Sequence, residues 1–129
     1  MRRRRHLRRL DRIAPGLRVQ VFLITCCVHG RRPVLTRGRT PRVLTQSWRE
    51  APEIHGWMVG RYVIMPDHVH FFAAPQGNDA KTLGQFMSRW KTWTGNRIRE
   101  VLPSFRWQSE FFDHLLRSEQ SYEQKWQYV

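Results

Sequence analysis

Apolar residues gather in three short stretches of the chain that are rich in β-branched and aromatic side chains. These stretches are residues 17–28 (LRVQVFLITCCV), 56–65 (GWMVGRYVIM) and 68–74 (HVHFFAA). Short apolar runs bounded by Gly and Pro are typical of strands in a sheet. Pro66 and Asp67 separate the second run from the third, and this pair is typical of tight turns. We therefore predict one central strand, followed later in the chain by a hairpin.

Two other segments place apolar residues three and four positions apart, which is the spacing of an amphipathic helix. They are residues 41–50, predicted to form a short helix, and residues 79–101, predicted to form the main helix. Asn78 or Asp79 is expected to cap the start of the main helix, because short polar side chains accept from free backbone N–H groups there. The Thr-Gly-Asn sequence at 94–96 is expected to fray or bend this helix.

The order of these elements predicts the fold class. Residues 105–117 are expected to be extended or irregular, and residues 118–129 to begin as a last helix. Strand, helix, strand, strand, helix, strand and helix is the order of an α+β fold, a ferredoxin-like split βαβ with an antiparallel sheet and helices mainly on one face. A chain of 129 residues has room for one such domain. We assign this domain to residues 17–129 and a basic arm to residues 1–16.

Charge points to a polyanionic partner. The chain has 23 Lys and Arg against 10 Asp and Glu, a net charge of +13, and such an excess favours binding to nucleic acid. Seven of the first twelve residues are Arg, which either bind phosphates without regard to sequence or serve only solubility. Trp90 and Trp93 of the main helix are expected to pack in the core; the alternative is that they form, with the neighbouring cations, a surface on which bases of single-stranded DNA stack. The predicted phosphate contacts are Arg2, Arg3, Arg4, Arg5, Arg89, Lys91, Arg97 and Arg99.

Cysteine usage and hydropathy favour a reduced, cytoplasmic protein that does not enter a membrane. Cys26 and Cys27 are adjacent, a spacing unlike that of paired zinc ligands, and neighbouring residues of a strand point to opposite faces. The longest apolar run is far shorter than a membrane span, and the Arg-rich start lacks the apolar stretch of a signal peptide.

His68 and His70 form the clearest candidate for chemistry. Residues two apart on a strand project from the same face, roughly 6–7 Å apart at the backbone, so two imidazoles in this pattern can converge on one divalent metal ion. Val69 between them would point into the core. Taken alone, the pattern also fits two histidines that merely pack or face solvent.

The surrounding residues carry a resemblance. The segment YVIMPDHVHFF at residues 62–72 closely resembles the signature of the single-tyrosine HUH transposases, especially the IS200-like and REP-associated branches. Similarity extends to the Gly-Trp pair at 56–57, to FMSRWK at 86–91, and to WQSEFFDHLLRSEQSYEQKWQYV at 107–129. The resemblance implies an enzyme that nicks single-stranded or hairpin DNA and transfers the strand through a 5′-phosphotyrosine, with Mg²⁺ or Mn²⁺ held by His68 and His70. Relatives include both dimers and monomers.

The resemblance also implies a nucleophile near the end of the chain. Tyr128 matches the position of the catalytic tyrosine best, Tyr122 matches a packing tyrosine one to two turns earlier, and Tyr62 is expected to pack in the hairpin. His114 remains open as a third metal ligand, a DNA contact or a packing residue.

The end of the chain departs from the family pattern. The family continues with Asn-Pro shortly after its tyrosine, whereas this sequence stops at Val129, so we expect a domain truncated at its C-terminus. The alternative to an active enzyme is therefore a catalytically impaired module that binds DNA hairpins.

Overall fold

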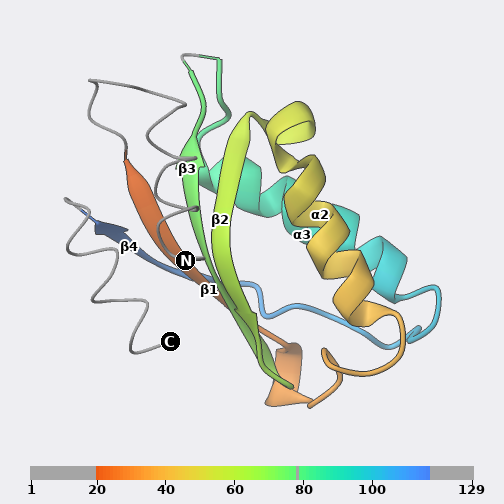
Figure 1. Ribbon diagram of the computed structural model, residues 1–129. Helices are drawn as coiled ribbons and strands as arrows, with labels where there is room; N and C mark the ends of the chain where they lie inside the picture. Colours follow the sequence, from red (N-terminus) through yellow and green to blue (C-terminus); the bar gives the residue numbers. More distant parts are fainter. Residues whose placement is uncertain (1–19, 78, 117–129) are drawn as a thin grey trace.

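A computed structural model describes residues 20–77 and 79–116, which form one antiparallel sheet covered by two helices. The strands are β1 (Val21–Cys27), β2 (Trp57–Ile64), β3 (His68–Pro75) and β4 (Phe112–Leu116), and the helices are α2 (Thr40–His55) and α3 (Leu83–Ile98). A short 3₁₀ turn, η1, spans His29–Arg31. The strand order is β2-β3-β1-β4, and both helices lie on the same side of the sheet (Figure 1). The predicted ferredoxin-like α+β fold is confirmed. The basic arm and the predicted last helix lie outside the described residues.

Side chains of β1 and β3 alternate between the two faces of the sheet. On the face toward the helices, hereafter the helix face, Ile24, Val69 and Phe71 are fully buried. The opposite face, hereafter the histidine face, carries Thr25 and His70, which are directly paired across β1 and β3. This period of two confirms the central strand and the hairpin predicted from the sequence.

Helix α2 is longer than predicted. Its buried stripe continues past residue 50 through Ala51 to His55. The helix therefore extends to His55, although Pro52 lies in its last turn. Gly56 ends it in a left-handed conformation with φ +73°, and its N–H bonds back to the carbonyls of Ala51 and Pro52. A Cβ at this glycine would also lie 3.1 Å from the Cα of Ala80, so both conformation and space favour glycine at this position.

Helix α3 begins later than predicted and is not interrupted. Thr82 caps it, rather than Asn78 or Asp79, through a reciprocal capping box with Gln85. The helix also passes through the Thr-Gly-Asn sequence at 94–96. Thr94 is buried there, and its hydroxyl donates to the Trp90 carbonyl at 2.8 Å and accepts from the indole N–H of Trp107 at 2.9 Å.

The core between the helices and the sheet contains four buried tryptophans, which are Trp48, Trp57, Trp90 and Trp107. Trp90 is fully buried, stacks on Trp48 with ring centres 6.1 Å apart, and donates its indole N–H to the Ser47 hydroxyl. Packing was the prediction for Trp90, and it is confirmed. Trp93 differs, because it is only partly buried and the guanidinium of Arg97 lies 3.6 Å from its ring centre.

No helix within the described ranges is long and apolar enough to cross a membrane.

Candidate active site

His68 and His70 lie side by side at the start of β3, on the histidine face. Their ring centres are 4.8 Å apart, and the rings meet edge to face at 83°. Val69 between them is fully buried on the helix face and anchors the strand. The strand spacing predicted from the sequence therefore brings the two imidazoles together.

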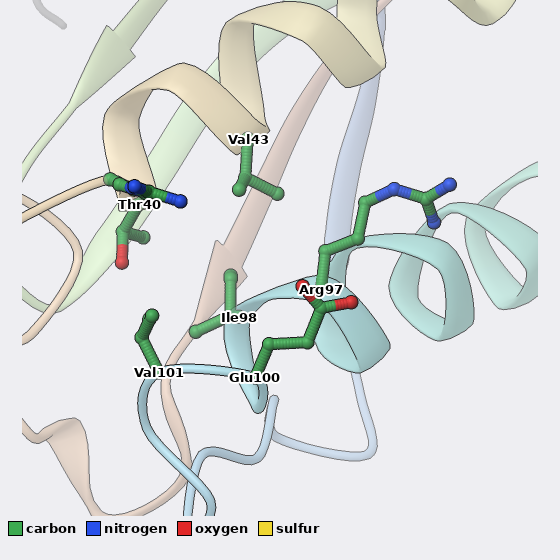
Figure 2. A pocket seen from close by; sticks show the side chains of 7 residues that line it. Thr40, Val43, Arg97, Ile98, Glu100 and Val101 are labelled. Carbon is green, nitrogen blue, oxygen red and sulfur yellow. The ribbon is translucent and has the colours of Figure 1, made fainter.

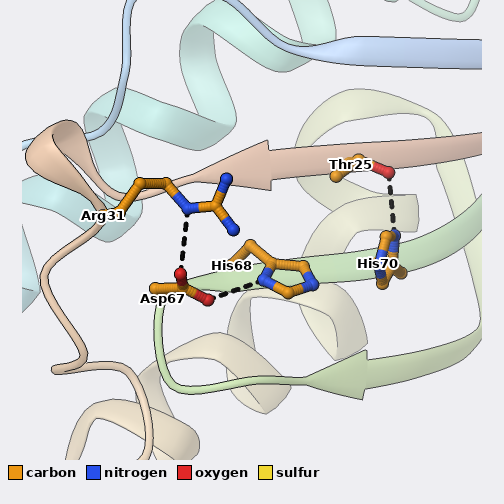
Figure 3. Close-up of polar contacts among 5 residues, drawn as sticks. All are labelled: Thr25, Arg31, Asp67, His68 and His70. Atoms are coloured by element: carbon orange, nitrogen blue, oxygen red, sulfur yellow. Dashed lines mark hydrogen bonds and ion pairs between the residues drawn. The ribbon is translucent and has the colours of Figure 1, made fainter.

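His68 is oriented by the residue that precedes it. Asp67 places Oδ1 2.7 Å from Nδ1 of His68, and its other oxygen, Oδ2, accepts from Nε of Arg31 at 2.9 Å (Figure 3). The hydrogen bonds from His68 and then from Arg31 hold the pKa of Asp67 below its usual range. An ionised carboxylate can only accept, so Nδ1 of His68 carries the proton; in the neutral ring, Nε2 then has the free lone pair.

His70 is oriented by the neighbouring strand. The hydroxyl of Thr25 on β1 lies 2.8 Å from Nδ1 of His70 (Figure 3). When this hydroxyl accepts from Nδ1–H, the lone pair of Nε2 is left to bind a metal ion. Burial, followed by the nearby His68, lowers the pKa of His70, which favours the neutral form that metal binding requires.

The turn before the histidines is fixed by backbone hydrogen bonds. The N–H of Leu35 donates to the Pro66 carbonyl and the N–H of Val28 donates to the Asp67 carbonyl, each at 2.9 Å. Arg31 has φ +55°, an uncommon conformation for a residue other than glycine, and this places its side chain beside Asp67. Asp67 is thus held both through its backbone and through its side chain.

His114 does not join the pair. On β4 it is exposed and pairs with Leu23, so it shares the histidine face, while His70 pairs with Thr25. Two strand spacings separate His114 from His70, roughly 10 Å across the sheet before the offset along the strands is added. Among residues 20–77 and 79–116, no group of three or more His, Cys, Asp or Glu is placed to hold a metal ion. The described chain therefore offers two imidazole ligands.

The four predicted phosphate contacts on α3 differ in environment. Arg89 and Arg97 are exposed. Lys91 instead places Nζ 2.8, 3.2 and 2.9 Å from three successive backbone carbonyls, which are those of Gln108, Ser109 and Glu110. Its burial lowers its pKa.

Arg99 is also engaged within the chain. It donates to the Phe105 carbonyl and to the side chain of Asn96, at 3.1 and 2.7 Å. Lys91 and Arg99 thus hold the segment between α3 and β4, and only Arg89 and Arg97 of the four present exposed side chains.

Several predicted site residues lie outside the described residues. They are Arg2, Arg3, Arg4, Arg5, Tyr122 and Tyr128. Tyr62 lies within them. It packs against Trp48 with ring centres 4.6 Å apart, although 41% of its surface remains exposed.

Comparison with known proteins decides the family. Residues 19–128 match the family described as Transposase IS200 like. The chain belongs to this family. The resemblance inferred from residues 62–72 is confirmed. None of the curated proteins matches this IS200-like transposase.

Solved structures share the fold of this IS200-like transposase. One is a candidate transposase from Deinococcus radiodurans R1, with a TM-score of 0.66 and 17% identity over 88% of this chain and 91% of that chain. Another is a REP-associated tyrosine transposase bound to a REP hairpin, with a TM-score of 0.62 and 17% identity. The match to the second covers 84% of this chain but 63% of that chain. At such identities the likeness concerns the fold.

Sequence reasoning missed the residues that orient the histidines of this IS200-like transposase. Asp67 was interpreted only as a turn residue, and Arg31 was not singled out. Thr25 offered a signal, since it is the one hydroxyl residue in the apolar strand Val21–Cys27. A polar side chain in a central strand needs a partner, and here that partner is His70.

Proposed function

We propose that this transposase cuts and rejoins single-stranded DNA at a metal ion held by His68 and His70. The observation that carries the proposal is the pair itself, because each Nδ1 has a hydrogen-bond partner and each Nε2 is left as a possible ligand. Of Mg²⁺ and Mn²⁺, two nitrogen ligands favour Mn²⁺, since Mg²⁺ prefers oxygen. When bound, such an ion polarises the scissile phosphate and stabilises the leaving oxygen.

The proposed nucleophile is Tyr128. The proposal rests on the family resemblance, because this residue lies outside the described residues. Its phenol oxygen loses its proton and bonds to phosphorus, the bond from phosphorus to the 3′ oxygen breaks, and the 3′ oxygen leaves as a hydroxyl after taking up a proton. The resulting 5′-phosphotyrosyl link retains the energy of the phosphodiester, so a second 3′-hydroxyl can reverse the step without a nucleotide cofactor. Tyr122 is the alternative nucleophile.

The proposed substrate is single-stranded DNA next to a hairpin. The net charge of +13 and the exposed Arg89 and Arg97 support it, as does the REP hairpin bound to the similarly folded structure. We expect Arg2–Arg5 to add phosphate contacts, so deletion of residues 1–12 should flatten the dependence of DNA affinity on salt. An unchanged slope would remove the arm from the proposal. Either a monomer or a homodimer of the protein can carry out this chemistry.

The test is a covalent adduct. A hairpin oligonucleotide with randomised single-stranded flanks and a 3′ label is incubated with protein and Mn²⁺, then denatured. We expect a labelled protein band that is lost in Tyr128→Phe and in His70→Ala and kept in Tyr122→Phe. An adduct mapped to Tyr122 would replace the nucleophile. DNA binding without any adduct would favour a module that binds hairpins and does not cut them.

A further inference from the structure

A cavity of about 280 Å³ lies away from the histidines, where α2 passes over β2. Strand β2 is an edge of the sheet, and its pairing with β3 is irregular between Val59 and Tyr62, where Gly60 and Arg61 bulge. The cavity is lined by residues of both elements, among them Thr45, Trp48, Arg49, Gly60 and Tyr62. Its volume is at the small end for ligand sites, which suits one ring system rather than a large ligand.

The aromatic wall of this cavity is partly open to solvent. Tyr62 keeps 41% of its surface exposed, and its inner side packs on the nearly buried ring of Trp48. An aromatic ring held from behind and exposed in front is a stacking platform whose position costs little entropy to fix.

One cationic side chain accompanies the wall. Arg49 adds an exposed guanidinium beside the cavity, which can meet a phosphate.

A second cavity shows what these features add. It holds about 210 Å³ between the start of α2 and the end of α3, where Val43 points toward Ile98 and Val101 lies below (Figure 2). Its lining has no aromatic ring, and the charged side chains of Arg39, Arg97 and Glu100 stand beside its aliphatic residues. Both cavities have arginine for a phosphate, but a ligand that stacks on an aromatic ring fits the first cavity and not the second.

We propose that the cavity lined by Trp48, Arg49 and Tyr62 binds one unpaired nucleobase of the DNA, with the base stacked on Tyr62 and a neighbouring phosphate at Arg49. This inference rests on the proposed DNA activity. It adds a site on the helix face that reads one nucleotide outside the cleavage position.

The register of β2 connects this site to the histidines. Tyr62 faces α2, while the next residue, Val63, pairs with His70. Only the edge strand β2 therefore separates the two sites. A single strand that crosses this edge can place one base against Tyr62 and a phosphate nearby in sequence at the histidine pair.

The test combines base removal with substitution. Abasic positions are scanned one at a time through a labelled single-stranded oligonucleotide, and dissociation constants are measured by fluorescence anisotropy. We expect one position at which loss of the base weakens binding about tenfold, the size of one base–aromatic stack. Tyr62→Leu should lose that position-specific effect, and Arg49→Ala should weaken binding to every oligonucleotide. Arg42→Ala, an exposed arginine on the same helix that does not line the cavity, is the matched control.

The outcomes separate this site from the proposed chemistry. A flat abasic scan, or a scan unchanged by Tyr62→Leu, would overturn the base site while adduct formation still stands. Saturation-transfer NMR with deoxynucleoside monophosphates tests the base site without DNA cleavage. A saturation-transfer signal that is present in the unaltered protein and lost in Tyr62→Leu supports the base site even if no DNA is cut. A change of oligomeric state in Tyr62→Leu with unchanged DNA affinity would make this surface a protein contact and would also overturn the proposal.

Discussion

The two faces of the sheet show how one strand serves both stability and chemistry. On the helix face, β3 contributes Val69 and Phe71 to a core with Trp90, and all three are fully buried. On the histidine face, the same strand contributes His68 and His70, which are partly exposed and bonded to Asp67 and Thr25.

The histidine face is itself divided along the strands. Phe72 and Ala74, farther along β3, are buried in a small second cluster with Leu116. Along β3, the polar side chains of the histidine face thus lie only at the end next to the Pro66-Asp67 turn. Successive residues of β3 point to opposite faces of the sheet and have separate roles. Substitutions on one face should therefore leave the other face largely intact.

The largest expected effect is on the stability of the helix face. Trp90→Ala removes a fully buried ring and its bond to Ser47, and should lower the free energy of unfolding by about 3–5 kcal/mol. Phe112→Ala on β4, where the ring is 60% exposed, should cost far less. Urea denaturation of both variants measures the contrast. Equal losses would show that the two faces do not divide stability as described.

The same division explains what the sequence could predict. Alternation and helical spacing predicted the order of elements, because burial of one face determines both patterns. The cap at Thr82 was missed although its capping box with Gln85 is a local sequence pattern. The unbroken helix through Thr94 was missed because it depends on a contact with Trp107. Trp107 lies 13 residues after Thr94 and outside the helix, so the spacing of residues within the helix cannot reveal this contact.

The candidate site shows the same limit. His68 and His70 were predictable because their spacing alone places them on one face. Lys91 was predicted to face phosphates because its position on α3 is known from the pattern, but the carbonyls of residues 108–110 that surround it follow only from how the chain returns to the sheet. Thr25 was missed for the same reason, since its partner lies 45 residues away.

A smaller effect is expected from the residue that orients His70. Thr25→Val removes the hydroxyl and keeps the shape of the side chain, so Mn²⁺ affinity should fall about 10- to 100-fold, as for other partners of metal-binding histidines. Thr92→Val, an exposed threonine on α3, is the matched control. Calorimetric titration of metal gives the affinity and thermal unfolding gives the stability. Unchanged Mn²⁺ affinity in Thr25→Val would exclude this role.

The smallest effect concerns acid stability and compares His55, buried in α2, with His70 on the histidine face. Burial, then Lys81 and Arg89, lowers the pKa of His55 in α2 below 6.5, and burial also lowers that of His70. Because the unfolded chain then takes up a proton first as pH falls below about 6.5, metal-free protein should lose stability toward pH 5.

Substitution separates the two contributions. His55→Gln should reduce the loss of stability between pH 7 and pH 5 without changing metal affinity, whereas His70→Gln should change both. Urea midpoints at the two pH values, with metal titrations at pH 7, provide the comparison. A pH dependence identical to that of the unaltered protein in both variants would contradict the assigned pKa directions.

The central claim is that the two histidines of β3 bind the metal ion directly through their imidazoles. Electron spin echo envelope modulation of Mn²⁺ bound to the protein detects ¹⁴N from coordinated imidazole. We predict imidazole modulation in the unaltered protein, reduced in His68→Ala and in His70→Ala, and absent from the double variant. A spectrum without nitrogen modulation, or one that is the same in the unaltered protein and the double variant, would contradict the account.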